Sequence, residues 1–221
     1  MRRLIGASII PFSIDPNTEN VYFLLGCEQW NKKYTDFGGV ASSKDTSPSM
    51  VAAREFHEET ACIVPFFDYE LRESFMYRRK FESIQRALGD NQYLYKIRFS
   101  VGTDSKYISY LVKIPWDPSR VYKFKKTIKY MLRRRDQQDV FRSFRSYRYP
   151  SYKFHPILRL MTHRLKPYLE MDNIRYVSIP QLKKLIETSK VTEYASTRLT
   201  AAMGLLETVN VPDKPVDIPP L

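Results

Sequence analysis

Residues 38–64 read GGVASSKDTSPSMVAAREFHEETACIV, and this stretch decides the fold of the chain. Near its middle, Ser47 is followed directly by Pro48. This pair is a helix-start signal, because a hydroxyl can cap the free amides and proline suits the first helical position. We therefore expect a helix to begin here and to carry the run REFHEE that follows.

Three carboxylates of that run are expected on one face of the helix. At about 100° per residue, Glu55, Glu58 and Glu59 fall within about a third of the circumference. Such neighbours repel, at roughly 0.2–0.5 kcal/mol per adjacent pair. A divalent cation would convert this repulsion into binding, and carboxylate oxygens suit Mg²⁺ or Mn²⁺. The plainer alternative is a solvated acidic face with no ligand.

The stretch resembles the Nudix box, the signature of hydrolases that cleave nucleoside diphosphates linked to another moiety. The family pattern is Gly, five residues, Glu, seven residues, then Arg-Glu-apolar-any-Glu-Glu-any-Gly-apolar. The positions that match it in order are Gly39, Arg54, Glu55, Phe56, Glu58, Glu59 and Cys62. The resemblance implies an α/β fold, a Nudix-like α/β/α sandwich with a mixed sheet, and a metal-dependent hydrolase.

The chain departs from that pattern at three points. Asp45 stands where the first Glu belongs, the run from there to Arg54 is one residue too long, and Ala61 replaces the closing Gly. We expect the loop at 42–46 to absorb the extra residue and Asp45 to anchor that loop as a hydrogen-bond acceptor. Ala61 needs only a modest backbone change if its φ stays negative. His57 is expected to be a partly exposed structural residue.

The resemblance also implies the roles of the box residues. Glu55, Glu58 and Glu59 take the positions of the family's metal ligands, together with the backbone carbonyl of Gly38. Arg54 takes the position of the arginine that orients the glutamates through charge-assisted contacts. The implied cofactor is Mg²⁺ or Mn²⁺.

A further carboxylate is expected to act as a base or an extra ligand. Glu170 is our choice, because it precedes the strand-like run at 174–179 at the spacing that some family members show. Glu82 is the competitor, and we expect it in a loop before a hairpin. With Glu170, the candidate catalytic residues are Arg54, Glu55, Glu58, Glu59 and Glu170.

The positive charge of the chain is concentrated in one segment. The 221 residues carry a net charge of +12, and residues 117–168 alone hold 15 Lys and Arg against 3 Asp and Glu. The rest of the chain is therefore neutral. We predict a Nudix-like catalytic domain from residues 1–116 and 169–221, with 117–168 as a basic, aromatic-rich and mainly helical insertion.

Arginines in the insertion are candidates for substrate binding, because Lys and Arg neutralise phosphates and aromatic rings stack on bases. The candidate substrate-binding residues are Arg133, Arg134, Arg135, Arg142 and Arg145. The alternative is that the arginines form a solvated face and that the aromatic residues form the core of a small helical unit.

Strand patterns flank this segment on both sides. Alternating or apolar runs predict strands at residues 4–12, 21–28, 92–101, 106–116 and 174–179, with another at 64–77. The pair at 92–116 is joined by a Gly-containing turn and predicts a hairpin. Helices are predicted at about 180–189 and 193–209. This order agrees with the Nudix sandwich.

Several function classes remain open at this stage. The leading one is a pyrophosphohydrolase that cleaves a phosphoanhydride bond in a nucleotide-containing polyphosphate, with 5′-capped RNA, and hence mRNA decapping, as the sharpest version. Small dinucleoside polyphosphates and inositol pyrophosphates are alternative substrates. A different class is a Nudix-fold protein that binds RNA or a partner with weak or no hydrolase activity. No apolar run reaches 18 residues, and the two cysteines suggest no disulfide framework, so we expect an intracellular, most simply cytoplasmic, protein.

Overall fold

The computed structural model describes residues 3–61, 63–64, 77–130, 132–133, 170–208 and 216–218. In these ranges eight strands form one mixed sheet, in the order β3-β2-β1-β6-β5-β8, with β4 paired to β1 and β7 paired to β2. The strands are β1 (Arg3–Ile14), β2 (Val21–Glu28), β3 (Tyr34–Thr35), β4 (Phe37–Val40), β5 (Tyr95–Val101), β6 (Ser105–Lys113), β7 (Met171–Ser178) and β8 (Val216–Ile218). The parallel β1–β6 pair and the antiparallel β5–β6 hairpin lie at its centre.

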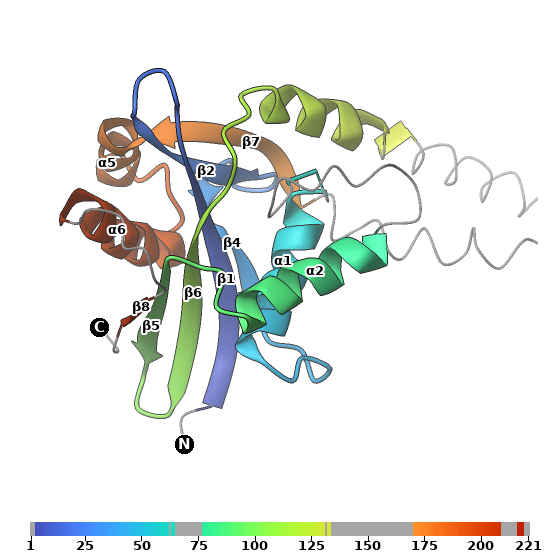
Figure 1. Cartoon of the computed structure of the whole chain (residues 1–221), viewed down its shortest axis with the longest axis vertical. Helices are drawn as coiled ribbons and strands as arrows, with labels where there is room; N and C mark the ends of the chain where they lie inside the picture. Colours follow the sequence, from blue (N-terminus) through green and yellow to red (C-terminus); the bar gives the residue numbers. More distant parts are fainter. Residues whose placement is uncertain are drawn as a thin grey trace, which may run out of the picture.

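Helices cover both faces of this sheet (Figure 1). They are α1 (Pro48–Glu59), α2 (Tyr77–Gly89), α5 (Ile179–Glu187), α6 (Glu193–Thr208) and a helix over 120–130 that continues at 132–133. Helices α1 and α2 lie on one face, and α5 and α6 lie on the other. The predicted α/β/α sandwich with a mixed sheet is confirmed.

Strand β1 shows how the sequence builds the two cores. Ala7 and Ile9 are buried in the cluster that packs against α1 and α2, whereas Ile10 and Phe12 are buried in the cluster that packs against α5 and α6. This alternation follows from the two-residue period of a strand. The strand reads as almost continuously apolar because both of its faces are covered.

The sheet divides between β1 and β2. These strands pair only where Phe12 lies opposite Phe23 and at the next two positions toward the turn. Farther along the same edges, residues 34–40 fill the gap, since β3 pairs with β2 and β4 pairs with β1. Asp36 lies where the chain passes from one strand to the other. The segment that leads into the box is therefore wedged into the sheet rather than placed on its surface.

The described part of the basic segment begins inside the core. Phe124 and Ile128, on the 120–130 helix, are buried in the same cluster as α1. Arg120 is also buried, and its Nη1 donates to the carbonyl of Pro115 and to the Tyr176 hydroxyl, 2.8 Å away. Most of the predicted insertion lies outside the described residues, so its boundaries stay a prediction.

Two sequence expectations in this region need comment. The strand predicted at 64–77 lies almost wholly outside the described residues. Glu82, expected in a loop, instead lies on α2, a helix that the sequence analysis missed. Among the described residues, no helix is both long and apolar enough to span a membrane.

Candidate active site

Helix α1 begins as the sequence predicts. Ser47 is the N-cap, its hydroxyl accepts a hydrogen bond from the Met50 amide at 3.2 Å, and Pro48 is the first helical residue. The other end of the helix corrects an expectation. Ala61 has a φ of +50°, in the left-handed region that favours glycine, so the negative φ we assumed is wrong. The backbone at Ala61 thus adopts a conformation that a glycine would take up more easily.

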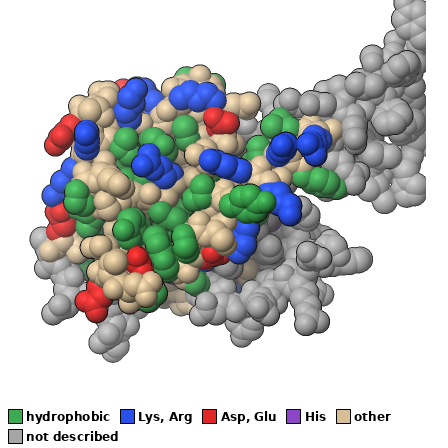
Figure 2. Space-filling view, turned by 90° about the horizontal axis from the view of Figure 1, so that it is seen from above, with side chains coloured by type: hydrophobic (Ala, Val, Ile, Leu, Met, Phe, Trp, Pro, Cys, Tyr) green, Lys and Arg blue, Asp and Glu red, His purple; other side chains and the backbone are tan. Residues whose placement is uncertain are grey.

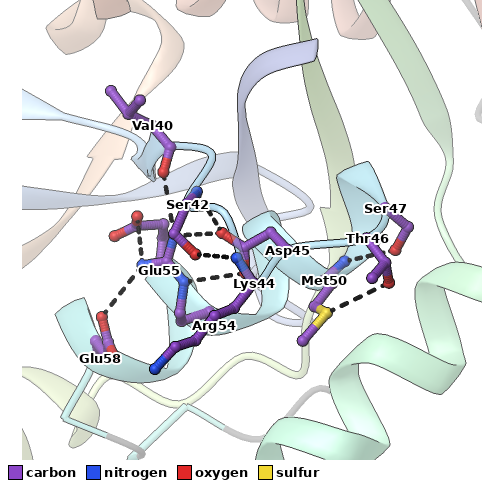
Figure 3. Close-up of polar contacts among 10 residues, drawn as sticks. All are labelled: Val40, Ser42, Lys44, Asp45, Thr46, Ser47, Met50, Arg54, Glu55 and Glu58. Atoms are coloured by element: carbon purple, nitrogen blue, oxygen red, sulfur yellow. Dashed lines mark hydrogen bonds and ion pairs between the residues drawn. The ribbon is translucent and has the colours of Figure 1, made fainter.

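Arg54 is the centre of the polar contacts around α1 (Figure 3). Its Nη1 donates to Glu55 Oε1 at 2.7 Å and lies 3.6 Å from Glu58 Oε2. Its Nη2 donates to Asp45 Oδ2 at 2.9 Å and to the Val40 carbonyl at 3.1 Å. One guanidinium therefore neutralises carboxylates from both the helix and the preceding loop, which agrees with the orienting role that the resemblance implies.

Asp45 holds the loop before α1 in place. Its Oδ2 accepts a hydrogen bond from the Ser42 amide at 2.8 Å, in addition to the contacts from Arg54. Burial opposes ionisation of this carboxyl, but the hydrogen bonds from Arg54 and Ser42 outweigh it and lower its pKa below the usual value. These contacts fit the loop-anchoring role expected for Asp45.

The two glycines of β4 lie directly against the box carboxylates. The Gly38 amide donates to Glu59 Oε2 at 2.8 Å. A Cβ on Gly39 would lie only 2.4 Å from Glu55 Oε1, so only glycine lets this carboxylate approach the strand. Gly38 is equally constrained, because an added Cβ would meet the Ser8 Cβ at 2.2 Å. The predicted metal-ligand role of the Gly38 carbonyl stays a prediction.

All three box glutamates are harder to ionise than free glutamate. Burial is the main cause, and it raises the pKa of Glu58 to about 7 and that of Glu55 in the same direction. Glu59 is buried, and desolvation together with the charges of Glu55 and Asp36 raises its pKa well above the usual value. Carboxylates in such surroundings gain most from a nearby cation.

Glu170 lies close enough to act on this group. After burial and the nearer charges, its carboxylate also raises the pKa of Glu55, Glu58 and Glu59. Its backbone carbonyl accepts a hydrogen bond from the Gln29 amide at 2.9 Å, which fixes the chain just before β7. Glu170 thus shares one electrostatic environment with the three box carboxylates, although it follows them by more than a hundred residues in the sequence.

The other predicted site residues have different fates. His57 is buried, with 6% exposure, and not partly exposed as expected. Arg133 is exposed at the end of the described part of the basic helix. The remaining predicted substrate-binding residues, Arg134, Arg135, Arg142 and Arg145, lie outside the described residues. Cys27 is a buried free thiol, and its pKa is raised mainly by burial.

The donor set fits a hard divalent cation in chemistry but is not a ready-made cage. The available donors are carboxylate oxygens, which Mg²⁺ and Mn²⁺ prefer. Yet within the described part of the chain no three Asp, Glu, His or Cys side chains converge closely enough to hold an ion. Instead, Glu55 and Glu58 form ion pairs with Arg54. Binding a metal would require these side chains to turn from Arg54 toward a shared point.

A second buried ion pair adjoins the site, and the sequence analysis did not find it. Arg198 on α6 donates from Nε to Asp36 Oδ2 at 2.8 Å and from Nη2 to Oδ1 at 2.5 Å. The two residues are 162 positions apart, so no local pattern could have paired them. The only hint was Asp36 itself, directly before the Phe-Gly-Gly of β4.

Solved structures with a similar fold include the following three proteins. An Ap4A hydrolase from C. elegans in a binary complex is 10% identical with a TM-score of 0.41, over 91% of this chain and 98% of that one. A MutT/Nudix family protein from Listeria innocua is 11% identical with a TM-score of 0.41, over 91% and 93%. A Nudix hydrolase from Alicyclobacillus acidocaldarius is 9% identical with a TM-score of 0.41, over 96% and 99%.

These likenesses concern the fold. Two of the three neighbours are themselves described as Nudix proteins. At such identities and TM-scores they carry no argument about substrate or mechanism. No protein-family model matches the chain, and no curated protein matches it in sequence.

Proposed function

We propose that this protein is a divalent-metal-dependent Nudix-type pyrophosphohydrolase that cleaves a phosphoanhydride bond in a nucleotide-containing polyphosphate. The observation that carries the proposal is that Glu59 and Glu55 lie against the glycines of β4, while Glu170 acts electrostatically on both of these carboxylates and on Glu58. Buried carboxylates that repel one another reduce stability unless a ligand compensates them. Their retention here favours a binding role.

Each residue has a proposed part in that chemistry. Bound Mg²⁺ or Mn²⁺ would screen the charge that gathers on the phosphate oxygens. Glu55, Glu58 and Glu59 would hold the ions, and Arg54 would keep its contact with Asp45 and so hold the loop before α1 in place. Glu170 is exposed and is proposed to accept the proton of the attacking water.

We further propose that the substrate is a 5′-capped or otherwise 5′-polyphosphorylated RNA. The support comes from the exposed face of the 120–133 helix. Lys125, Lys129 and Arg133 recur every four residues and form one exposed row. A second exposed row beside it consists of Tyr122, Lys126 and Tyr130. Lysines for phosphates next to tyrosines for bases is the composition that single-stranded RNA binding requires.

The position of this face supports the same substrate. Phe124 and Ile128 anchor the helix in the cluster that also holds Ala61 and Met171, next to the end of α1 and to Glu170. Figure 2 shows Lys and Arg side chains, with hydrophobic ones among them, on the arm that leads away from the body of the molecule. A chain of phosphates leaving the carboxylates could therefore continue along the helix. The plainer alternative is a solvated helix face.

The decisive experiment measures hydrolysis and binding together. We expect Mg²⁺- or Mn²⁺-dependent cleavage of capped RNA in a panel that also contains nucleoside diphosphate derivatives, dinucleoside polyphosphates and inositol pyrophosphates. If about six phosphates are neutralised, RNA affinity should fall with a log–log salt slope near about −4. A flat salt dependence would rule out RNA as the substrate and leave a small molecule. If no substrate in the panel is cleaved, the hydrolase function itself is ruled out.

A charge-matched pair of variants separates the helix face from net charge. Replacing Lys125, Lys129 and Arg133 with Gln should reduce the magnitude of the salt slope by about 2, since three contacts are lost. The control replaces three exposed lysines at the opposite face of the sheet with Gln, namely Lys183, Lys184 and Lys190. It removes the same charge and should leave the slope unchanged. Equal effects in both variants would show that only net charge matters.

The second candidate function is a Nudix-fold binding protein without turnover. Two observations favour it: Arg54 already neutralises Glu55 and Glu58, and no three acidic side chains in the described ranges converge on a point. This candidate predicts salt-dependent RNA binding that needs no divalent cation and leaves the RNA intact.

A further inference from the structure

Asp36 and Arg198 form a buried, bidentate ion pair that has further contacts to Thr35 and Tyr107. The guanidinium of Arg198 grips both carboxylate oxygens, and the Asp36 side chain is fully buried. The Thr35 hydroxyl lies 3.3 Å from Asp36 Oδ1. On its other side, the guanidinium carbon lies 4.6 Å from the centre of the Tyr107 ring. The pair thus joins α6 to the sheet at the point where β3 passes into β4.

Residues 36–39 are held by two helices, α6 at Asp36 and α1 at the three residues that follow. Asp36 is held by α6 through Arg198, and Phe37 packs edge-on against Phe56 of α1 with ring centres 5.5 Å apart. Gly38 donates to Glu59, and Gly39 receives the carboxylate of Glu55. A displacement at Asp36 would therefore reach the Gly38 amide two residues later.

We propose that Arg198, acting through Asp36, is a positioning residue that holds β4 against the box carboxylates. The inference rests on the proposed function, because it assigns the pair a task in aligning Glu59 and Glu55. Arg198 itself touches no reacting group. Its contribution is geometric: a bidentate fork fixes the orientation of the Asp36 carboxylate, which a single ammonium contact would leave free to turn.

The test uses Arg198→Lys, which keeps the charge but loses the fork. The first readout is amide hydrogen exchange in the metal-free protein, where the Gly38 amide should exchange at least about tenfold faster than in wild type. The matched control is Arg98→Lys, which makes the same change in the exposed pair with Asp217 on the β5–β8 edge. It should leave Gly38 exchange unchanged.

Two further readouts exclude a merely structural role. In Arg198→Lys, kcat should fall about tenfold while KM stays within about twofold, because alignment and not substrate binding is lost. The affinity for Mn²⁺ alone should also fall in the same variant. It is measured from the electron paramagnetic resonance signal of the free ion. The double variant Asp36→Asn with Arg198→Gln leaves no unpaired buried charge and should remain folded. Its kcat and Mn²⁺ affinity should fall as they do in Arg198→Lys.

The outcomes distinguish this inference from the proposed function. Wild-type Gly38 exchange, kcat and Mn²⁺ affinity in both Arg198 variants would overturn the positioning role. A wild-type protein that cleaves nothing, with the exchange difference at Gly38 intact, would overturn the hydrolase and leave the link from Arg198 to β4 standing.

Discussion

Arg54 and Arg198 each pair with carboxylates beside β4, but they do so in opposite ways. Arg54 is 27% exposed and divides its contacts among Asp45, Glu55, Glu58 and a backbone carbonyl. Arg198 is 12% exposed and gives both of its hydrogen bonds to one fully buried aspartate. A shared, half-exposed contact can be exchanged for a metal ion at little cost, whereas a buried bidentate pair cannot be opened without leaving a charge unpaired. The comparison separates a site that can rearrange from the frame that supports it.

The largest expected effect is on turnover, when a glutamate of α1 is changed. Glu58→Gln or Glu59→Gln keeps the shape of the side chain and removes its charge, so kcat should fall by about 10²–10⁴-fold, as for other groups that act on transition-state charge. Glu187→Gln, at the exposed end of α5, should match wild type. Steady-state kinetics measure both. Wild-type turnover in both box variants would refute the metal-site assignment.

The next effect concerns stability, and here the larger loss is expected at Arg198 and the smaller one at Arg54. Arg198→Met leaves Asp36 buried and unpaired, and should lower the free energy of unfolding by about 3–5 kcal/mol. Arg54→Met leaves Glu55 and Glu58, which are partly exposed and can take up protons, and Asp45, whose side chain is buried but keeps the hydrogen bond from the Ser42 amide, so a loss of about 1–2 kcal/mol is expected. Urea unfolding of both variants checks this order. Equal losses would show that the two pairs do not differ as the structure suggests.

A smaller effect is expected from pH. The pKa of Glu58 is about 7 in the folded protein and 4.5 when unperturbed, so between these values the folded state binds the extra proton. Stability of the metal-free protein should therefore fall as pH rises through this window, by about 1–3 kcal/mol from this group. Urea unfolding from pH 4 to pH 8 measures it. Glu58→Gln should make the profile shallower, with a remaining slope from Glu55 and Glu59, and Mg²⁺ should restore stability at pH 8. An unchanged profile in the variant would contradict the shift.

The smallest effect is expected at Ala61. Its left-handed backbone costs about 1–2 kcal/mol, which Gly would relieve. Against this, Gly removes a buried methyl worth about 0.8 kcal/mol and adds about 0.4–1 kcal/mol of unfolded-state entropy. Ala61→Gly should thus change the free energy of unfolding by less than about 1 kcal/mol, and turnover by less than about twofold. A loss above 2 kcal/mol in thermal or urea unfolding would mean that the methyl packs better than its surroundings indicate.

The parts of the fold that the sequence predicted are those with local signals. Helix α1 was found because Ser47 and Pro48 mark its start and the glutamates follow a helical period. Strands β1, β2, β5, β6 and β7 were found from their apolar or alternating patterns. Helix α2 was missed, although Ile84, Ala87 and Leu88 are buried at helical spacing, because the preceding residues were interpreted as a strand.

The parts of the site that could not be predicted depend on distant contacts. Nothing local connects Arg198 to Asp36, and nothing in the sequence shows that residues 34–40 change partners within the sheet. The left-handed turn at Ala61 was also hidden, because an alanine gives no sign that the backbone there adopts a conformation that glycine favours. Glu170 is predicted from its spacing to the following strand, and its catalytic role stays a prediction.

Strand β8 has a consequence for the behaviour of the protein at high concentration. Its three residues pair in parallel with Tyr95–Ile97 and so occupy the outer edge of β5. An uncovered β5 would offer unpaired amides and carbonyls beside Tyr95 and Ile97, and such edges recruit strands from other molecules. The short β8, tied to β5 by the ion pair between Arg98 and Asp217, therefore acts as a guard against edge-to-edge aggregation.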